Sequence, residues 1–149
     1  MKCLIKRLDI STGNGSLPLL SKIGSVYNIT GNDVEWKYGY YNEYNGIYTD
    51  TGEKNYICTS ENEILKMKAG CHIEMENVNY SFFWNFFDVN GNPITRDASI
   101  SNVTSITFTK EQIPDVYYIS ISLRRQDRGV ISRDEFGSIL KSLHITYKA

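Results

Sequence analysis

The sequence has few of the residues from which metal centres and disulfide frameworks are built. It contains three cysteines, Cys3, Cys58 and Cys71, which form no CxxC pair, and two histidines, His72 and His144. It also lacks HExxH, GxSxG and GxxxxGK motifs and a dinucleotide-binding fingerprint. From these absences we expect no metal, no cofactor and no catalytic residues, so that the protein is not an enzyme.

The sequence also has no strong excess of acidic or basic residues and no long apolar segment. The formal net charge is -1 and the basic residues are scattered, which argues against nucleic acid and anionic membranes as partners. No apolar run approaches the roughly 20 residues of a membrane span. The start, Met1 to Arg7, reaches charged residues too early for a signal-peptide core, so we expect synthesis in a cytoplasm.

The redox state of the cysteines follows from that compartment. An odd number leaves at least one thiol free, and disulfides are rare in reducing compartments. We interpret Cys58 and Cys71 as small buried hydrophobes, although the two thiols could meet if their strands were neighbours.

What the sequence does contain is a clear strand signal over residues 115–125. Two sets of side chains alternate there with a period of two, which predicts a central strand with one buried face and one wet face. The sets are Tyr117, Ile119, Ile121 and Leu123 on the buried side and Tyr118, Ser120, Ser122 and Arg124 on the wet side.

Other segments give similar signals at intervals of about 8 to 15 residues, with turn formers between them. Aromatic residues on both faces of 80–88 predict a strand that is covered on both sides. Residues 109–112 and 132–135 have capping-box spacing, which predicts a single helical turn and a short helix. The remaining strands are expected over 34–48 (several short ones), 55–59, 63–68, 71–76, 103–108 and 143–147.

This pattern predicts an all-β protein, an antiparallel two-sheet β-sandwich. We place the sandwich at residues 31–149 and an extended N-terminal arm at 1–30. The arm contains the apolar residues Leu17, Pro18, Leu19 and Leu20 after a glycine-rich joint. These residues either pack along the domain or dock on another subunit, and we favour docking, in attachment or oligomerisation.

A series of aromatic and turn positions within the predicted sandwich has a familiar order. It consists of Trp36 with Gly39 and Tyr40, then 56–59, 68–70, 80–82, 87–91, 104–106, 113–114 and 117–124. Together these positions resemble a jelly-roll, carbohydrate-binding-module-like domain found in phage virion proteins and in surface proteins and glycan-active enzymes of bacteria. The resemblance covers residues 34–147.

The resemblance implies a non-catalytic phage virion accessory protein, a head decoration, head fibre or tail adhesin, that binds host-surface polysaccharide. It implies virion proteins and sister subunits as partners, in a homo-oligomer whose subunit number the sequence leaves open, a trimer included. The alternatives are a purely structural capsid or tail decoration protein with no glycan binding, and a bacterial surface adhesin module.

Glycan binding needs flat aromatic faces and planar polar groups. Trp36, Tyr38, Tyr41 and Tyr44 are candidates, since they lie in one segment together with asparagines. Tyr40 lies in the same segment, but Tyr40 and Trp36 also fit the core.

A basic cluster lies at the end of the strand predicted over residues 115–125. Arg124 and Arg125, with Asp127, could bind acidic sugars or a neighbouring subunit, or form a solvated hairpin tip. Asp88, Asn90 and Asn92 have the spacing of part of a calcium loop, but an ordinary turn is the better interpretation.

Overall fold

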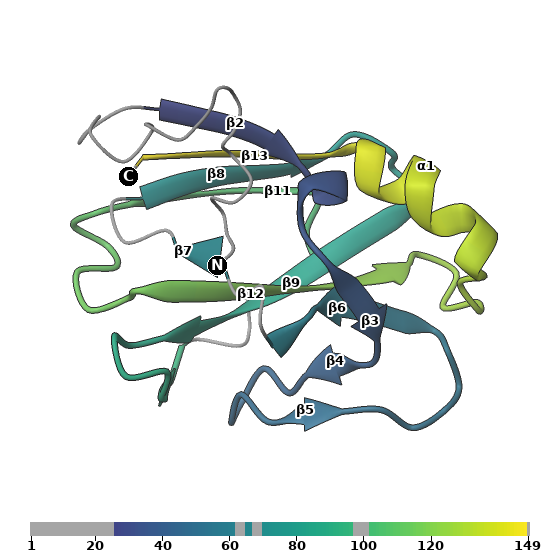
Figure 1. Ribbon diagram of the computed structural model, residues 1–149, viewed down its shortest axis with the longest axis horizontal. Helices are drawn as coiled ribbons and strands as arrows, with labels where there is room; N and C mark the ends of the chain where they lie inside the picture. The colour runs from purple at the N-terminus through teal and green to yellow at the C-terminus, as the bar shows by residue number, and fades with distance from the viewer. Residues whose placement is uncertain (1–25, 62–64, 67–69, 97–101, 149) are drawn as a thin grey trace.

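Two antiparallel sheets and a small hairpin make up the fold (Figure 1). The computed structural model describes residues 26–61, 65–66, 70–96 and 102–148. The larger sheet consists of β3 (Trp36–Tyr38), β6 (Tyr56–Thr59), β7 (Leu65–Lys66), β9 (Tyr80–Phe87), β10 (Pro93–Ile94) and β12 (Tyr118–Arg125). Its order is β10-β9-β12-β6-β3, with β7 also paired to β12.

The smaller sheet has the order β11-β8-β13-β2. Its strands are β2 (Val26–Thr30), β8 (Gly70–Met75), β11 (Ser105–Thr109) and β13 (Leu143–Lys148). Every pairing within both sheets is antiparallel. The predicted all-β, antiparallel class is therefore confirmed, and the arrangement is consistent with a two-sheet sandwich.

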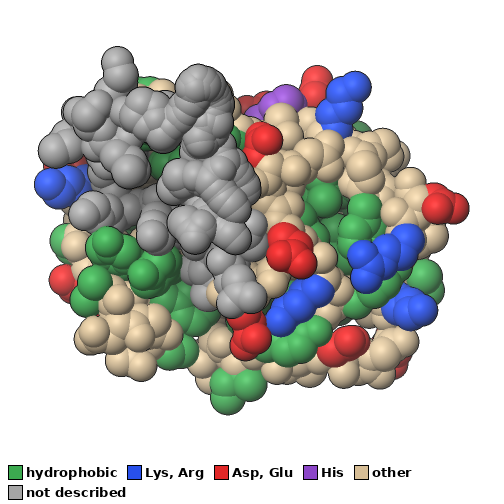
Figure 2. Space-filling view, in the orientation of Figure 1, with side chains coloured by type: hydrophobic (Ala, Val, Ile, Leu, Met, Phe, Trp, Pro, Cys, Tyr) green, Lys and Arg blue, Asp and Glu red, His purple; other side chains and the backbone are tan. Residues whose placement is uncertain are grey.

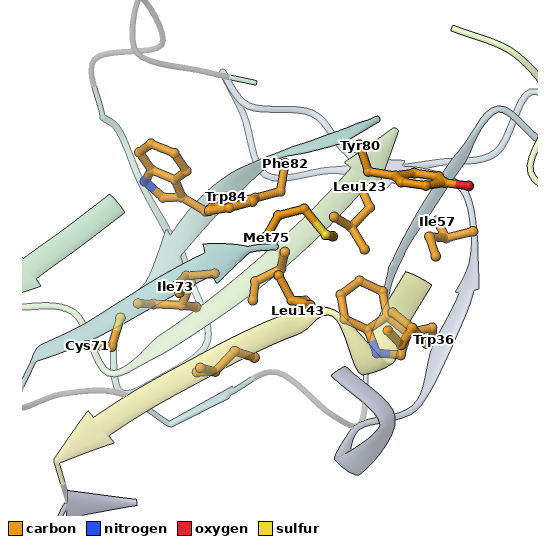
Figure 3. Packing of buried hydrophobic residues seen from close by; sticks show 14 of the residues in the cluster. Trp36, Ile57, Cys71, Ile73, Met75, Tyr80, Phe82, Trp84, Leu123 and Leu143 are labelled. Atoms are coloured by element: carbon orange, nitrogen blue, oxygen red, sulfur yellow. The ribbon is translucent and has the colours of Figure 1, made fainter. Parts of the chain in front are cut away.

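The hydrophobic core lies between the two sheets (Figure 3). The larger sheet contributes Ile57, Phe82, Trp84, Ile119, Ile121 and Leu123. The smaller sheet contributes Cys71, Ile73, Met75, Leu143 and Ile145. These residues alternate along their strands, as they must if only one face of each strand points at the other sheet.

β12 lies between β9 and β6, as its alternation predicts, and Ile119, Ile121 and Leu123 are fully buried. The prediction that its other face is wet is wrong, because Ser120 and Ser122 are also 0% exposed. A further layer covers this outer face, namely the hairpin of β4 (Tyr40–Tyr41) and β5 (Tyr48–Thr49).

The hairpin has a small core of its own against the outer face of the larger sheet. Tyr41, Cys58 and Phe87 are buried there, with Tyr48 and Tyr118 packed around them. The backbone N–H of Tyr41 donates to the Oγ of Ser122 at 3.2 Å, which fixes the hairpin to β12. The molecule therefore has three layers, because β9 and β12 are covered on both faces.

The smaller sheet begins earlier in the chain than the sequence suggested. Residues 26–30, placed in the arm, form β2 and pair with β13 at the edge of this sheet. The boundary expected at residue 30 therefore follows a strand of the sandwich. The arm residues Leu17, Pro18, Leu19 and Leu20 lie outside the described residues.

The structure also confirms the predictions for the capping box at residues 132–135 and for two of the cysteines. A short 3-10 helix, η4 (Arg133–Glu135), leads into α1 (Phe136–Lys141), and Glu135 accepts a hydrogen bond from the Ser132 backbone N–H at 3.1 Å, as the capping box predicts. Cys58 and Cys71 are free, buried and in different sheets, so the interpretation as small hydrophobes is confirmed.

Candidate functional site

The outer face of the larger sheet carries a cleft beside the β4–β5 hairpin. Its volume is about 140 Å³, and the side chains that line it come from the hairpin, β6, β9 and the segment before β11. They are Tyr40, Asn42, Glu43, Tyr44, Tyr56, Phe83 and Asn102. Four of the seven are aromatic, and the other three carry a planar amide or carboxylate.

Three of the rings form a cluster in the cleft wall. The ring centroids of Tyr40 and Tyr56 are 4.8 Å apart, and Phe83 lies 6.3 Å from Tyr40 and 6.1 Å from Tyr56. Such tilted and edge-to-face contacts are favourable and keep the rings in place. Since Tyr56 and Phe83 extend from strands, the sheet holds one side of the cleft rigid.

The fourth ring, Tyr44, is 72% exposed in the loop between β4 and β5. Asn42 organises this loop, because its side-chain Oδ1 accepts the backbone N–H of Tyr44 at 2.8 Å and its carbonyl oxygen accepts that of Gly46 at 2.7 Å. Asn85 in β9 donates its Nδ2 to the same carbonyl oxygen at 2.8 Å. The loop is therefore fixed to the sheet, and Tyr44 presents an exposed ring at the cleft.

The carboxylate of Glu43 lies near a cation. The Oε2 atom of Glu43 is 3.6 Å from the Nη2 atom of Arg96, whose side chain is 6% exposed. Arg96 also donates from Nε to the carbonyl oxygen of Trp84 at 2.8 Å. The charge of Glu43 is therefore largely offset within the protein.

Three of the predicted glycan-binding aromatics are placed elsewhere. Trp36 is buried in the core, where its Nε1 donates to the Gly31 carbonyl oxygen at 2.8 Å. Tyr38 packs against the same core and donates its hydroxyl to the Ile131 carbonyl oxygen at 2.7 Å. Tyr41 lies 3% exposed under the hairpin, where burial raises the pKa of its phenol. Of the four predicted aromatics, Tyr44 lines the cleft.

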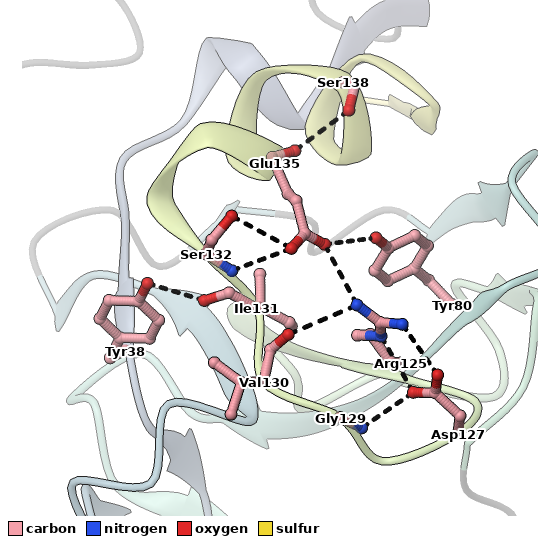
Figure 4. Close-up of polar contacts among 10 residues, drawn as sticks. All are labelled: Tyr38, Tyr80, Arg125, Asp127, Gly129, Val130, Ile131, Ser132, Glu135 and Ser138. Atoms are coloured by element: carbon pink, nitrogen blue, oxygen red, sulfur yellow. Dashed lines mark hydrogen bonds and ion pairs between the residues drawn. The ribbon is translucent and has the colours of Figure 1, made fainter.

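The predicted basic cluster is divided by the pleat of β12. Arg124 is on the outer face, opposite Tyr56 in the pairing with β6, whereas Arg125 extends toward η4, just before α1 begins. Arg125 binds Asp127 with two hydrogen bonds of 2.9 and 2.8 Å and lies 3.7 Å from Glu135 (Figure 4). These charges stabilise the loop from β12 to η4.

The electrostatics of that loop follow from the same contacts. The hydrogen bond from Arg125 holds the pKa of Asp127 below its usual range, and the backbone N–H of Ser132 does the same for Glu135. Tyr80, whose pKa is raised by burial, donates to Glu135 at 2.9 Å. A hollow of about 360 Å³ adjoins Tyr80, Arg125 and Asp127, but the charged groups at its edge already bind one another.

Neither histidine belongs to the cleft. His72 contacts Thr107 and Glu74, and His144 contacts Glu76, on the outer face of the smaller sheet. Among the described residues, no group of three or more His, Cys, Asp and Glu side chains is placed to hold a metal ion. The 88–92 segment is a turn that Asp88 closes, since its Oδ1 accepts the N–H groups of Asn90 and Asn92 at 2.9 Å.

On the side that Figure 2 shows, acidic and basic side chains are interspersed. In the described part of the chain, no helix has the length and apolar character needed to cross a membrane.

Sequence reasoning missed Tyr56 and Phe83 as parts of a site. The signal for Phe83 was present, because rings on both faces of 80–88 indicate a second covered surface.

Comparisons with protein-family models, with curated proteins and with solved structures found no match for this chain.

Proposed function

We propose that this protein is a non-catalytic glycan-binding module whose site is the cleft at Tyr40, Tyr44, Tyr56 and Phe83. The observation that carries the proposal is the combination of four rings with three planar polar side chains in one hollow. Aromatic faces stack on the apolar C–H surfaces of sugars, and amide and carboxylate groups hydrogen-bond to hydroxyls. The small volume suits one or two sugar units of a longer chain.

Binding without cleavage is the simpler chemistry for these residues. Hydrolysis of a glycosidic bond commonly uses two carboxylates about 5 to 10 Å apart. The described lining contains one carboxylate, Glu43, which lies beside Arg96. The proposal therefore assigns no catalytic residue.

The biological setting that we propose comes from the sequence resemblance. The module would be of the jelly-roll, carbohydrate-binding type and would be displayed on a phage virion, where many copies bind host-surface polysaccharide. A shallow site with one exposed ring gives weak binding, and multivalent display raises the overall strength without new contacts. The arm before residue 26 would attach the module to other virion proteins.

The test is binding of the purified protein, in multivalent form, to a panel of bacterial capsular and cell-wall polysaccharides. Tyr44→Ala should weaken binding about threefold to tenfold, because it removes one stacking ring. Tyr27→Ala is the matched control, since Tyr27 packs on Tyr147 on the other sheet.

Two results would count against the proposal. If the folded protein binds no polysaccharide of the panel, the purely structural decoration role replaces it. If Tyr44→Ala and Tyr27→Ala weaken binding equally, the site is elsewhere.

A further inference from the structure

Arg124 lies beside the aromatic cluster of the cleft. In the register of the larger sheet it is opposite Tyr56 of β6 and opposite Ser81 of β9. Directly opposed residues on one face have Cβ atoms about 4.5–5.5 Å apart. The guanidinium group therefore extends from the middle strand, between the cleft residue Tyr56 and the strand that carries Phe83.

The polar atoms at this place lack partners. The Nε of Arg124 and the Oγ of Ser81 are buried, and neither has a hydrogen-bond partner among the described residues. Ser81 is 0% exposed. Native proteins satisfy nearly all buried polar groups, so Arg124 retains hydrogen-bonding capacity that the described residues do not use.

The other arginines near these elements are already engaged. Arg125 binds the carboxylate of Asp127, and Arg96 lies beside Glu43. Within the described part of the chain, Arg124 is close to the cleft and forms no ion pair with a carboxylate. A ligand that extends from the cleft past Tyr56 would therefore meet a cation without a carboxylate partner, whereas the cleft's own acid, Glu43, lies beside Arg96.

We propose that the cleft selects acidic glycans, with a uronate carboxylate bound by Arg124 while the sugar rings stack on Tyr44 and Tyr40. This inference rests on the glycan-binding function proposed above. Guanidinium matches a carboxylate in shape and charge and binds it through two parallel hydrogen bonds.

The experiment compares one polymer in two forms, a polyuronate and the same polymer after chemical reduction of its carboxylates to primary alcohols. The protein should bind the polyuronate about tenfold or more tightly, and the preference should decrease as NaCl is raised. Arg124→Gln should remove this preference by weakening the binding of the polyuronate to about that of the reduced polymer. Arg124→Lys should retain part of it.

Arg128→Gln is the matched control, because it removes the same charge from an exposed loop residue outside the cleft. Thermal melting of each variant checks that it is folded. Equal binding of the two polymers, or a preference that survives in Arg124→Gln, would overturn the inference and leave the glycan-binding proposal in place. Binding to other polysaccharides but to neither form would do the same, whereas no binding to any polysaccharide would overturn both.

Discussion

Replacement of Tyr41 tests whether the β4–β5 hairpin is a true third layer. Tyr41 is 3% exposed, and its ring lies 5.9 Å from that of Tyr48 and 6.1 Å from that of Phe87. Its hydroxyl is buried without a hydrogen-bond partner among the described residues. The ring and the hydroxyl should therefore contribute to stability with opposite signs.

Two substitutions separate these contributions. Tyr41→Ala removes the ring and leaves a cavity, which for a buried aromatic residue lowers the free energy of unfolding by about 3 to 5 kcal/mol. Tyr41→Phe keeps the ring and removes an unsatisfied polar group, so we expect a free energy of unfolding that is unchanged or higher by about 1 kcal/mol. Urea unfolding followed by fluorescence gives both values, provided that the slope with urea stays constant.

Two outcomes would contradict this reasoning. If Tyr41→Ala lowers the free energy of unfolding by less than about 1 kcal/mol, the hairpin does not pack on the sheet as described. If Tyr41→Phe is itself destabilised by more than about 1 kcal/mol, the hydroxyl has a partner such as a buried water.

Two other measurements examine the charged loop and the thiols. The pKa values of Asp127 and Glu135 are lowered in the folded protein, so both carboxylates stabilise it above about pH 4.5. This stabilisation is lost as the pH falls through the folded-state pKa values. The urea midpoint of unfolding should therefore decrease in acid. Arg125→Gln should make that fall shallower, and an unchanged acid profile would refute the role of this ion pair. Burial raises the pKa of Cys58 and of Cys71 to about 12, so iodoacetamide at pH 8 should label either position only after unfolding. Labelling of native protein at these two residues, located by mass spectrometry, would contradict their burial.

Much of the sandwich could be predicted because its strands carry local signals. The alternation around Ile121 and the rings on both faces of β9 follow from the pleat, and they require no knowledge of the partner strand. The capping box at Ser132 is equally local, since donor and acceptor are three residues apart.

The third layer could not be predicted in the same way. Ser120 and Ser122 are small and polar, as the residues of a solvated face are. They are buried by a hairpin that lies far earlier in the chain. Its Tyr41, 81 residues before Ser122, donates a backbone hydrogen bond to the Ser122 hydroxyl. The cleft has the same origin. Tyr44 was found because it lies in a turn rich in asparagine, whereas Tyr56 and Phe83 meet only through the strand order β9-β12-β6.

The pairing of β2 with β13 also has a mechanical consequence. Val26 is opposite Lys148, so the described chain enters and leaves the sandwich at one corner. A force that separates these two ends would break the β2–β13 hydrogen bonds one after another, like a zipper. The β2–β13 edge is therefore the place where tension on the two ends of the described chain would first open the sandwich.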